Sequence, residues 1–317
     1  MKALAAKLWG SRTSDGATLT PAEALTVSVA GPAGGRPSDE ELDLFGLTHR
    51  GRVRPDNQDH FLICTVHPQV VIHGSSLPTA SELPLRGTRL ATVLLVADGV
   101  GGAAAGSDAA RLATEAITRY VASTLRCYHA VGAKNEGEFL DALRAAAFEA
   151  HDAVRAEASL RTDQQRMATT LTVGIAVWPW FYVVQVGDSR CYFYWDGELK
   201  QITRDQTVGQ ELVDRGVLPP DRLDRSPLKN VLSSAIGADE ALPDVTRISI
   251  EQRGCVVLLC TDGLNKHVSD EEIAAHLKDM ESAEKAARDL LTLALDRGGT
   301  DNITIAIGRA PLRKRTG

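Results

Sequence analysis

Three aspartates stand where runs of apolar residues end, as acids do at the rim of a sheet. Asp98 directly follows the apolar run 93–97, and Asp262 comes two residues after the run 256–260. A third run leads through a single glycine to Asp188. Asp98 and Asp262 each precede a glycine, which lets backbone and ligand approach closely because no Cβ intervenes. These acids are therefore placed to bind a ligand at a sheet rim.

Two more acids have related settings. Asp59 stands just before an apolar run that begins at Phe61, and Asp301 stands just before the run 303–307. One such acid is usually a turn or cap residue, but five on one chain indicate a cluster. Like charges a few ångströms apart repel, so a converging cluster needs bound protons or cations. The histidines and cysteines show no paired metal-ligand spacing, so oxygen ligands favour Mg²⁺ or Mn²⁺ over zinc.

A pair of ions bridged by a carboxylate indicates hydrolysis of a phosphate ester. Two ions about 4 Å apart lower the pKa of a shared water, hold it in line and neutralise phosphoryl oxygens. Arg54, five residues before Asp59, is suited to bind the phosphate through the N–H donors of its planar guanidinium. The alternative for Arg54 is an ordinary surface arginine.

Alternating apolar residues predict the strands that must position these acids. The clearest alternation runs through Leu171, Val173, Ile175 and Val177, which share one face because side chains alternate along a strand. We expect strands at 42–48, 61–66, 90–97, 170–178, 181–186, 191–195, 198–203, 245–250, 255–260 and 302–308.

Helical periodicity occupies three segments between the strands, at 109–121, 139–154 and 286–295. Several strands follow one another without a helix between them, which favours antiparallel sheets flanked by helices over a parallel design. The segment 205–226 differs, because one short helix at 210–216 is followed by prolines and charges. It is either an irregular surface excursion or a flap over a site.

Composition excludes several classes of protein. The 317 residues are 44% hydrophobic and 24% charged, as in ordinary globular domains. A formal net charge of −6 argues against a dedicated nucleic-acid binder, which needs surplus Lys and Arg. No run approaches the 18 apolar residues of a membrane span. We therefore expect a soluble protein without a membrane span and without a nucleic-acid partner.

The cysteines indicate a reducing compartment. Their number is odd and no two of them form a CxxC pair, which favours small reduced core residues over disulfides or a metal site. The five are Cys64, Cys127, Cys191, Cys255 and Cys260. Lys7 interrupts the short apolar run near the start of the chain, which is too short for a signal-peptide core. We expect a cytoplasmic location.

The order of the motifs resembles the type 2C family of metal-dependent Ser/Thr protein phosphatases, the PPM family, and its bacterial members in particular. The resemblance covers about residues 42–310, and order and spacing agree throughout. The matching segments are RPDNQD at 54–59, VADGVGG at 96–102 with Gly106, MATTL at 167–171, VGDSR at 186–190, IG at 236–237, TDGL at 261–264 and GTDNIT at 299–304. The resemblance implies an α+β fold, a four-layer α-β-β-α sandwich of two antiparallel sheets flanked by helices, with metals in a cleft at one end.

The resemblance also implies a role for each core acid. Asp98 would bridge two Mn²⁺ or Mg²⁺ ions, and the Gly99 carbonyl would bind the first of them. Asp262 and Asp301 would hold the second ion. With help from Asp262, Asp188 would bind a weaker third ion.

Two residues are expected to act on the substrate side of the metals. Asp59 would be a catalytic residue that acts through metal-bound water or hydrogen bonds. Arg54 would be catalytic through binding of the substrate phosphate. The segment 205–226 aligns with the family's variable flap, which helps to choose substrates.

The sequence departs from the common family pattern at three positions. Gln58 stands where many members have Glu, which bears on affinity for the second metal. Val100 occupies a position that is often His or Met, so protonation of the leaving group falls to water or another acid. Gln206 stands where His is usual, at the start of the flap. No core aspartate is replaced.

These observations predict a phosphoserine/phosphothreonine protein phosphatase. A water or hydroxide bridging the two metals would attack phosphorus in line, with no covalent phosphoenzyme, since no activated Cys or His nucleophile is present. The alternative is a catalytically silent phosphoprotein-binding regulatory domain of the same fold. A purely structural metal-binding domain would leave Arg54 and the Thr169-Thr170 segment unused.

The expected organisation has one catalytic domain at 41–311, containing the flap at about 205–226. Residues 1–40 are expected to form a flexible extension with a weak helix at 21–25, and 312–317 a basic tail. The expected partners are phosphorylated proteins and a cognate Ser/Thr kinase system in cytoplasmic signalling, and the expected state is a monomer.

Overall fold

The computed structural model describes residues 35–69, 71–72, 85–101, 103–131, 136–161 and 166–312. Most of the expected N-terminal extension, including Lys7 and the helix at 21–25, lies outside these residues. So do the side chain of Cys127 and almost all of the expected basic tail.

Two five-stranded antiparallel sheets form the centre of the fold. The first sheet has the strand order β1 (Asp43–His49), β12 (Ile303–Arg309), β11 (Val256–Cys260), β8 (Arg190–Trp195) and β9 (Glu198–Gln201). The second has the order β10 (Asp244–Ser249), β7 (Trp180–Val186), β6 (Leu171–Val177), β3 (Ala91–Ala97) and β2 (His60–Val66). A short pair, β4 (Gly99–Val100) and β5 (Ala168–Thr169), stands at one end.

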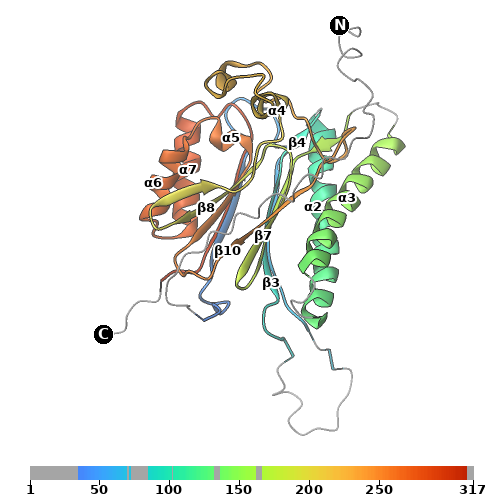
Figure 1. Cartoon of the computed structure of the whole chain (residues 1–317), viewed down its shortest axis with the longest axis vertical. Coiled ribbons are helices and arrows are strands. Elements are labelled where there is room, and N and C mark those ends of the chain that lie inside the picture. The colour runs from blue at the N-terminus through green and yellow to red at the C-terminus, as the bar shows by residue number, and fades with distance from the viewer. Residues whose placement is uncertain are drawn as a thin grey trace.

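Helices cover the outer face of each sheet, so that Figure 1 shows four layers side by side. The second sheet is covered by α2 (Ala103–Val131) and α3 (Glu136–Leu160). The first is covered by α6 (Asp270–Lys278) and α7 (Ala283–Asp296), with the short α5 (Asp262–Asn265) directly after β11. Helix α4 (Val208–Asp214) and the 3₁₀ helix η3 (Pro220–Arg225) belong to a separate excursion. The predicted α-β-β-α sandwich is confirmed.

Strand β3 shows why the central runs are apolar at nearly every position; Thr92 is its one polar residue. Val93 and Leu95 face the core beneath α2 and α3. Leu94 and Val96 face the core between the two sheets. Because successive side chains point to opposite faces, a strand covered on both sides must be largely apolar on both faces. The acid that follows such a strand is thereby carried to the rim.

The predicted strands agree with the structure to within about two residues at each end. The expected short helix at 210–216 is α4, and the proline-rich segment after it forms η3. Helices α5 and α6 were not predicted, although Ser269 and Glu272 form the capping box that starts α6. Cys191, Cys255 and Cys260 are free and buried, as expected of core residues.

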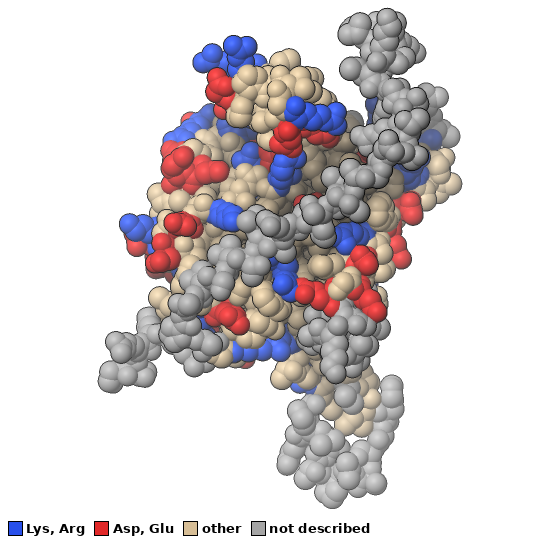
Figure 2. All heavy atoms as spheres, viewed as in Figure 1, with Lys and Arg blue, Asp and Glu red and all other residues tan. Residues whose placement is uncertain are grey.

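Charges of both signs are interspersed on the face shown in Figure 2. That mixture agrees with the modest formal net charge of −6. Among the described residues, no helix is long and apolar enough to cross a membrane.

Candidate active site

Antiparallel pairing brings the predicted acids to one end of the sandwich, at the top of Figure 1 near β4, α4 and α5. His60 pairs with Ala97, so the neighbouring Asp59 and Asp98 meet at the same edge of the second sheet. In the first sheet β11 ends where β12 begins, since Cys260 pairs with Ile305. Asp262 and Asp301 therefore stand beside each other at the corresponding end of that sheet.

Asp59 joins the two sheets through its side chain. It is 3% exposed, and its Oδ2 accepts hydrogen bonds from the Thr261 hydroxyl at 2.8 Å and the Thr304 hydroxyl at 2.7 Å. Its other oxygen, Oδ1, is buried without a hydrogen-bond partner. An ionised oxygen in that setting is costly unless a cation or a water reaches it.

Asn302 fixes the loop that carries Asp59. Its side-chain oxygen accepts from the backbone N–H of Gln58 at 2.9 Å. Its side-chain nitrogen donates to the carbonyls of Arg50 and Asp56, both at 2.9 Å. The segment before β2 is thus bound to the segment before β12, and the acids on each are held at a fixed separation.

Two threonines hold the backbone of Asp98 at the end of β3. The Thr170 N–H and the Thr169 hydroxyl donate to the Asp98 carbonyl at 2.9 and 2.8 Å. The Asp98 N–H donates to the Thr170 hydroxyl at 3.0 Å. The Thr169-Thr170 segment thus fixes the position of the Asp98 backbone.

Gly99 lies in a space that admits no larger residue. A Cβ built there would lie 2.3 Å from the Gly106 carbonyl oxygen and 2.8 Å from that of Gln58. Glycine is thus required where the chain after β3 runs close to the start of α2. The Gly99 backbone that was predicted to bind the first metal stands in this close approach.

Burial, together with the charges of neighbouring acids, raises the pKa values of three of the aspartates. Burial, with some opposition from the two threonine hydroxyls, raises the pKa of Asp59 to about 7. Burial raises the pKa of Asp98 well above its ordinary value, and the charge of Asp59 adds to the shift. Burial and the charge of Asp262 raise the pKa of Asp188 to about 7. Each raised pKa means that too little positive charge lies nearby to offset the cost of ionising that buried acid.

Asp262 and Asp301 differ from the other acids because basic side chains contact them. The Lys266 ammonium lies 2.6 Å from Asp262 Oδ2 and 2.7 Å from Asp301 Oδ2. Arg54 donates to Asp301 Oδ2 at 2.9 Å, and its Nε lies 2.8 Å from Asp301 Oδ1. Burial alone would raise the pKa of Asp301, but these hydrogen bonds outweigh burial and lower it. The pKa of Asp262 stays raised, because burial exceeds the effect of Lys266.

The donor set fits hard divalent cations. Asp262 Oδ1, like Asp59 Oδ1, is buried without a hydrogen-bond partner, and all the ligands offered are oxygens. In the part of the chain that the structure describes, no three acidic, histidine or cysteine side chains already converge as a coordination group. Full coordination therefore requires side chains to rearrange, and Lys266 and Arg54 hold the two acids that the second ion would need.

The start of the flap is tied to the same end of the sandwich. Arg190 at the start of β8 forms a two-pronged ion pair with Asp205, with contacts of 2.7 and 2.9 Å. The Gln206 side chain accepts from the Gly187 N–H at 2.9 Å and donates to the Leu242 carbonyl at 2.9 Å. Gln206, one of the departures from the family pattern, thus holds the start of the segment predicted to be a flap beside Asp188.

Sequence reasoning missed four residues that support the acids. They are Thr261, Asn302, Thr304 and Lys266. The first three lie inside motif segments, but their hydrogen bonds join distant positions. Lys266 had a local signal, because a lysine four residues after an acid in a helix faces that acid.

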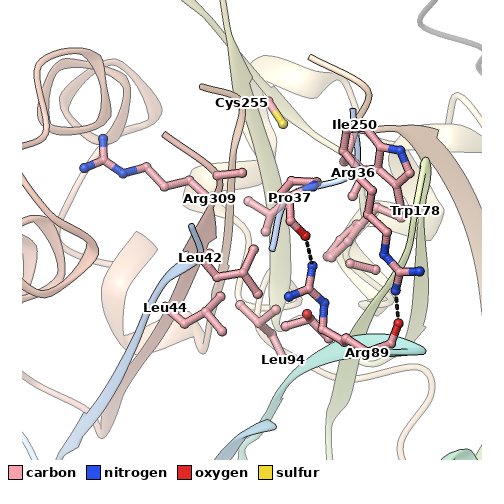
Figure 3. A pocket seen from close by; sticks show the side chains of 16 residues that line it. Arg36, Pro37, Leu42, Leu44, Arg89, Leu94, Trp178, Ile250, Cys255 and Arg309 are labelled. Carbon is pink, nitrogen blue, oxygen red and sulfur yellow. Dashed lines mark hydrogen bonds between the residues drawn. The ribbon is translucent and has the colours of Figure 1, made fainter. Parts of the chain in front are cut away.

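A separate cavity of about 70 Å³ lies away from the acids (Figure 3). Its walls include Leu94 and Val257 from the two facing sheets. At its rim the Arg89 guanidinium donates to the Pro37 carbonyl at 2.8 Å, and Arg36 donates to the Arg89 carbonyl. None of the five predicted site aspartates lines this cavity, so the cavity is separate from the candidate active site.

Comparison with known proteins gives consistent matches. The sequence profile described as "Protein phosphatase 2C" matches residues 84–296. Serine/threonine protein phosphatase PstP of Mycobacterium tuberculosis is 37% identical over 217 residues, which is 68% of this chain and 40% of that protein. Protein phosphatase PhpP of Streptococcus pneumoniae is 31% identical over 219 residues, covering 68% of this chain and 85% of that protein. The chain thus spans about 40% of the length of the M. tuberculosis relative.

Solved structures share the fold. The crystal structure of the M. tuberculosis serine/threonine phosphatase PstP/Ppp superimposes with a TM-score of 0.68 at 30% identity, covering 86% of this chain and 99% of that one. A catalytic domain of PstP in complex with two manganese ions gives a TM-score of 0.65 at 29% identity, covering 86% of this chain and 99% of that one.

Proposed function

The chain belongs to the protein phosphatase 2C family, and on that premise we propose that it is a metal-dependent phosphoserine/phosphothreonine protein phosphatase. The relatives named above are protein phosphatases, PstP is named as a serine/threonine protein phosphatase, and one related catalytic domain binds two manganese ions. The proposal assigns Mn²⁺ or Mg²⁺ as the cofactor, with two core ions and a weaker third.

The observation that supports this most strongly is the meeting of acids from both sheets at one end of the sandwich. Two of them, Asp59 and Asp262, each keep one buried oxygen without a hydrogen-bond partner. The pKa values of Asp59 and Asp188 are raised to about 7, and that of Asp98 is also raised. A silent phosphoprotein-binding domain would have no use for such an uncompensated cluster.

Each residue then has a definite task. Asp98, Asp262 and Asp301 would hold the two core ions with the Gly99 carbonyl, and Asp188 would serve the third. When bound, the ions lower the pKa of a water between them and neutralise the phosphoryl oxygens.

The remaining tasks fall to side chains beside the ions. Asp59 keeps Oδ1 free to accept a hydrogen bond from a water, while Thr261 and Thr304 fix its orientation through Oδ2. Arg54 contacts Asp301, and because its side chain is 53% exposed it remains accessible to a substrate phosphate. Val100 beside the site is exposed and has no ionisable proton, so water or another acid protonates the leaving group.

One assay tests the proposal. The purified chain is expected to hydrolyse phosphoserine and phosphothreonine peptides with Mn²⁺ and to stop when a chelator is added. Asp98→Asn and Asp262→Asn should each lower kcat by more than about a hundredfold with an unchanged circular dichroism spectrum. Asp289→Asn, on the outer face of α7 and paired with Lys285, is the control and should leave kcat unchanged. Normal turnover in both site variants would refute the assignment.

The finer assignments complete the proposal. Residues 41–311 form one catalytic domain, whose segment 205–226 is a flap that selects among phosphoproteins. The substrates come from a Ser/Thr kinase system in cytoplasmic signalling, and the protein acts as a monomer. The free, buried cysteines support a reducing compartment. Limited proteolysis should yield a stable core beginning near residue 40, and gel filtration should give the mass of one chain.

A further inference from the structure

Lys266 bridges the two acids that would hold the second ion. It directly follows α5, four residues after Asp262, so its side chain returns along the helix toward that acid. Its ammonium lies 2.6 Å from Asp262 Oδ2 and 2.7 Å from Asp301 Oδ2. The Lys266 side chain is 26% exposed, and those of Asp262 and Asp301 are 14% and 16% exposed. The ion pairs are thus partly shielded from water.

Positive charge is distributed unevenly among the acids of the site. Asp301 contacts both Lys266 and Arg54, and Asp262 contacts Lys266. Within the described residues, Asp59 and Asp98 have no ion pair with Lys, Arg or His. Asp59 and Asp98 are therefore open to a cation, whereas Asp262 and Asp301 already contact the Lys266 ammonium.

We propose that Lys266 is a built-in cation that occupies the place of the second metal ion and must be displaced before that ion binds. This inference rests on the metal site of the proposed function and goes beyond it, because it assigns the order and the relative strength of the two binding steps. The first ion binds at Asp98 and the Gly99 carbonyl, beside Asp59, without competition. The second binds at Asp262 and Asp301 only after the ammonium leaves.

The physical argument is competition for the same oxygens. An ammonium 2.6–2.7 Å from two carboxylate oxygens engages the same lone pairs that a divalent ion requires. An ammonium and a divalent ion held by the same two carboxylates would also repel each other strongly in a partly buried site. Lysine suits this role because its four-carbon stem is flexible and its ammonium is a compact point charge. Partial exposure gives the side chain a path to solvent.

The test is calorimetric titration of Mn²⁺ into the metal-stripped full chain. The wild-type protein should bind two ions in separate steps, the second clearly weaker than the first. Lys266→Met keeps the length of the stem and removes the charge, so it should strengthen the second step by about tenfold or more while changing the first much less. Lys266→Gln, which can still donate to the carboxylates, should give the same strengthening and guards against a folding defect in the Met variant.

Two controls separate displacement from a general change in charge. Arg52→Met removes a charge beside the same loop, since the Arg52 N–H donates to the Gly299 carbonyl while its guanidinium contacts Asp296. Lys285→Met removes a charge from the outer face of α7, where it pairs with Asp289. Both should leave the second step within about twofold of wild type.

A purely structural role for Lys266 predicts a different result. The thermal stability of Lys266→Met would then stay reduced at saturating Mn²⁺, whereas displacement predicts that Mn²⁺ restores it to the wild-type value. An unchanged or weakened second step in both Lys266 variants would overturn the inference while leaving the metal site intact. Failure of the wild-type chain to bind two ions would instead overturn the proposed function and the inference together.

Discussion

The Thr304 hydroxyl donates to Asp59 Oδ2 at 2.7 Å, across 245 positions of the chain. Thr304 lies in β12 of one sheet, and Asp59 immediately precedes β2 of the other. This bond and the one from Thr261 both use Oδ2, and Asp59 Oδ1 is left buried without a hydrogen-bond partner. The two sheets thus share the placement of one proposed catalytic residue.

Thr304→Val removes the hydroxyl that orients the Asp59 side chain while changing the side-chain volume little. Loss of a hydrogen bond to a buried carboxylate should lower the free energy of unfolding of the metal-free protein by about 1–3 kcal/mol. It should also weaken Mn²⁺ binding by about 10- to 100-fold, as expected for a residue that orients a ligand. Denaturant unfolding and calorimetry measure the two effects. Thr292→Val, whose hydroxyl bonds the Arg288 carbonyl on the exposed face of α7, should change neither.

Gly99→Ala should damage both stability and turnover. The added Cβ would meet the carbonyl oxygens of Gly106 and Gln58, which are backbone atoms and cannot move aside cheaply. A cost of about 1–3 kcal/mol is expected for such overpacking, with loss of phosphatase activity because the Gly99 carbonyl is displaced. Gly137→Ala is the control, since nothing lies within 4 Å of a Cβ there. Full activity in Gly99→Ala would contradict the assigned role of this carbonyl.

Arg54→Ala should mainly raise KM. Arg54 is exposed and its guanidinium reaches Asp301, so at saturating Mn²⁺ it is available for the substrate phosphate. Loss of one charge-assisted contact should raise KM for a phosphopeptide about tenfold or more with little change in kcat. Steady-state kinetics of Arg52→Ala, whose side chain pairs with Asp296, provide the comparison. A lower kcat at unchanged KM would rule out a role in ground-state phosphate binding.

The metal-free protein should lose stability as pH rises. Asp59 and Asp188 have ordinary pKa values near 3.8 and folded values of about 7. A carboxyl with a raised pKa in the folded state contributes stability at low pH, and this contribution is lost between its unfolded and folded pKa values. The melting temperature should therefore be lower at pH 8 than at pH 5.5, by about 3 °C or more.

Two measurements identify the source of that pH dependence. Asp59→Asn cannot ionise and should flatten the profile. Saturating Mn²⁺ should raise the melting temperature most at pH 8, where the acids are ionised. A metal-free profile that rises with pH, and is the same in Asp59→Asn, would be incompatible with the uncompensated cluster.

The Arg190–Asp205 pair should control the action of the flap on large substrates. Asp205→Ala removes a two-pronged ion pair whose members are 18% and 19% exposed. Loss of such a charged hydrogen bond costs about 1.5–3 kcal/mol, and we expect kcat/KM to fall more for a phosphoprotein than for an aryl phosphate. Asp221→Ala, at an exposed position in η3, is the matched control. Equal losses on both substrates would place Asp205 in the catalytic centre rather than in flap support.

Much of the fold could be predicted from local pattern. The strand 171–177 was recognisable because its large apolar residues alternate. Strand β3 was recognisable because it is covered on both faces and is therefore almost entirely apolar. Helix α6 was missed although Ser269 and Glu272 carry its start signal. The two-residue strands β4 and β5 carry no such signal, because a pair that short is created by the neighbouring chain.

For the site, the sequence by itself determined which acids stand at the ends of strands and therefore reach a rim. Asp98, Asp188 and Asp262 follow strands, and Asp59 and Asp301 precede them. Only the tertiary structure decided what each acid contacts. Thr261 and Thr304 bind Asp59 from the opposite sheet, while Arg54 and Lys266 meet on Asp301. Strand endings are local, since they depend on side-chain periodicity. Hydrogen bonds across more than 200 positions depend on how two sheets pack, and no short pattern encodes that.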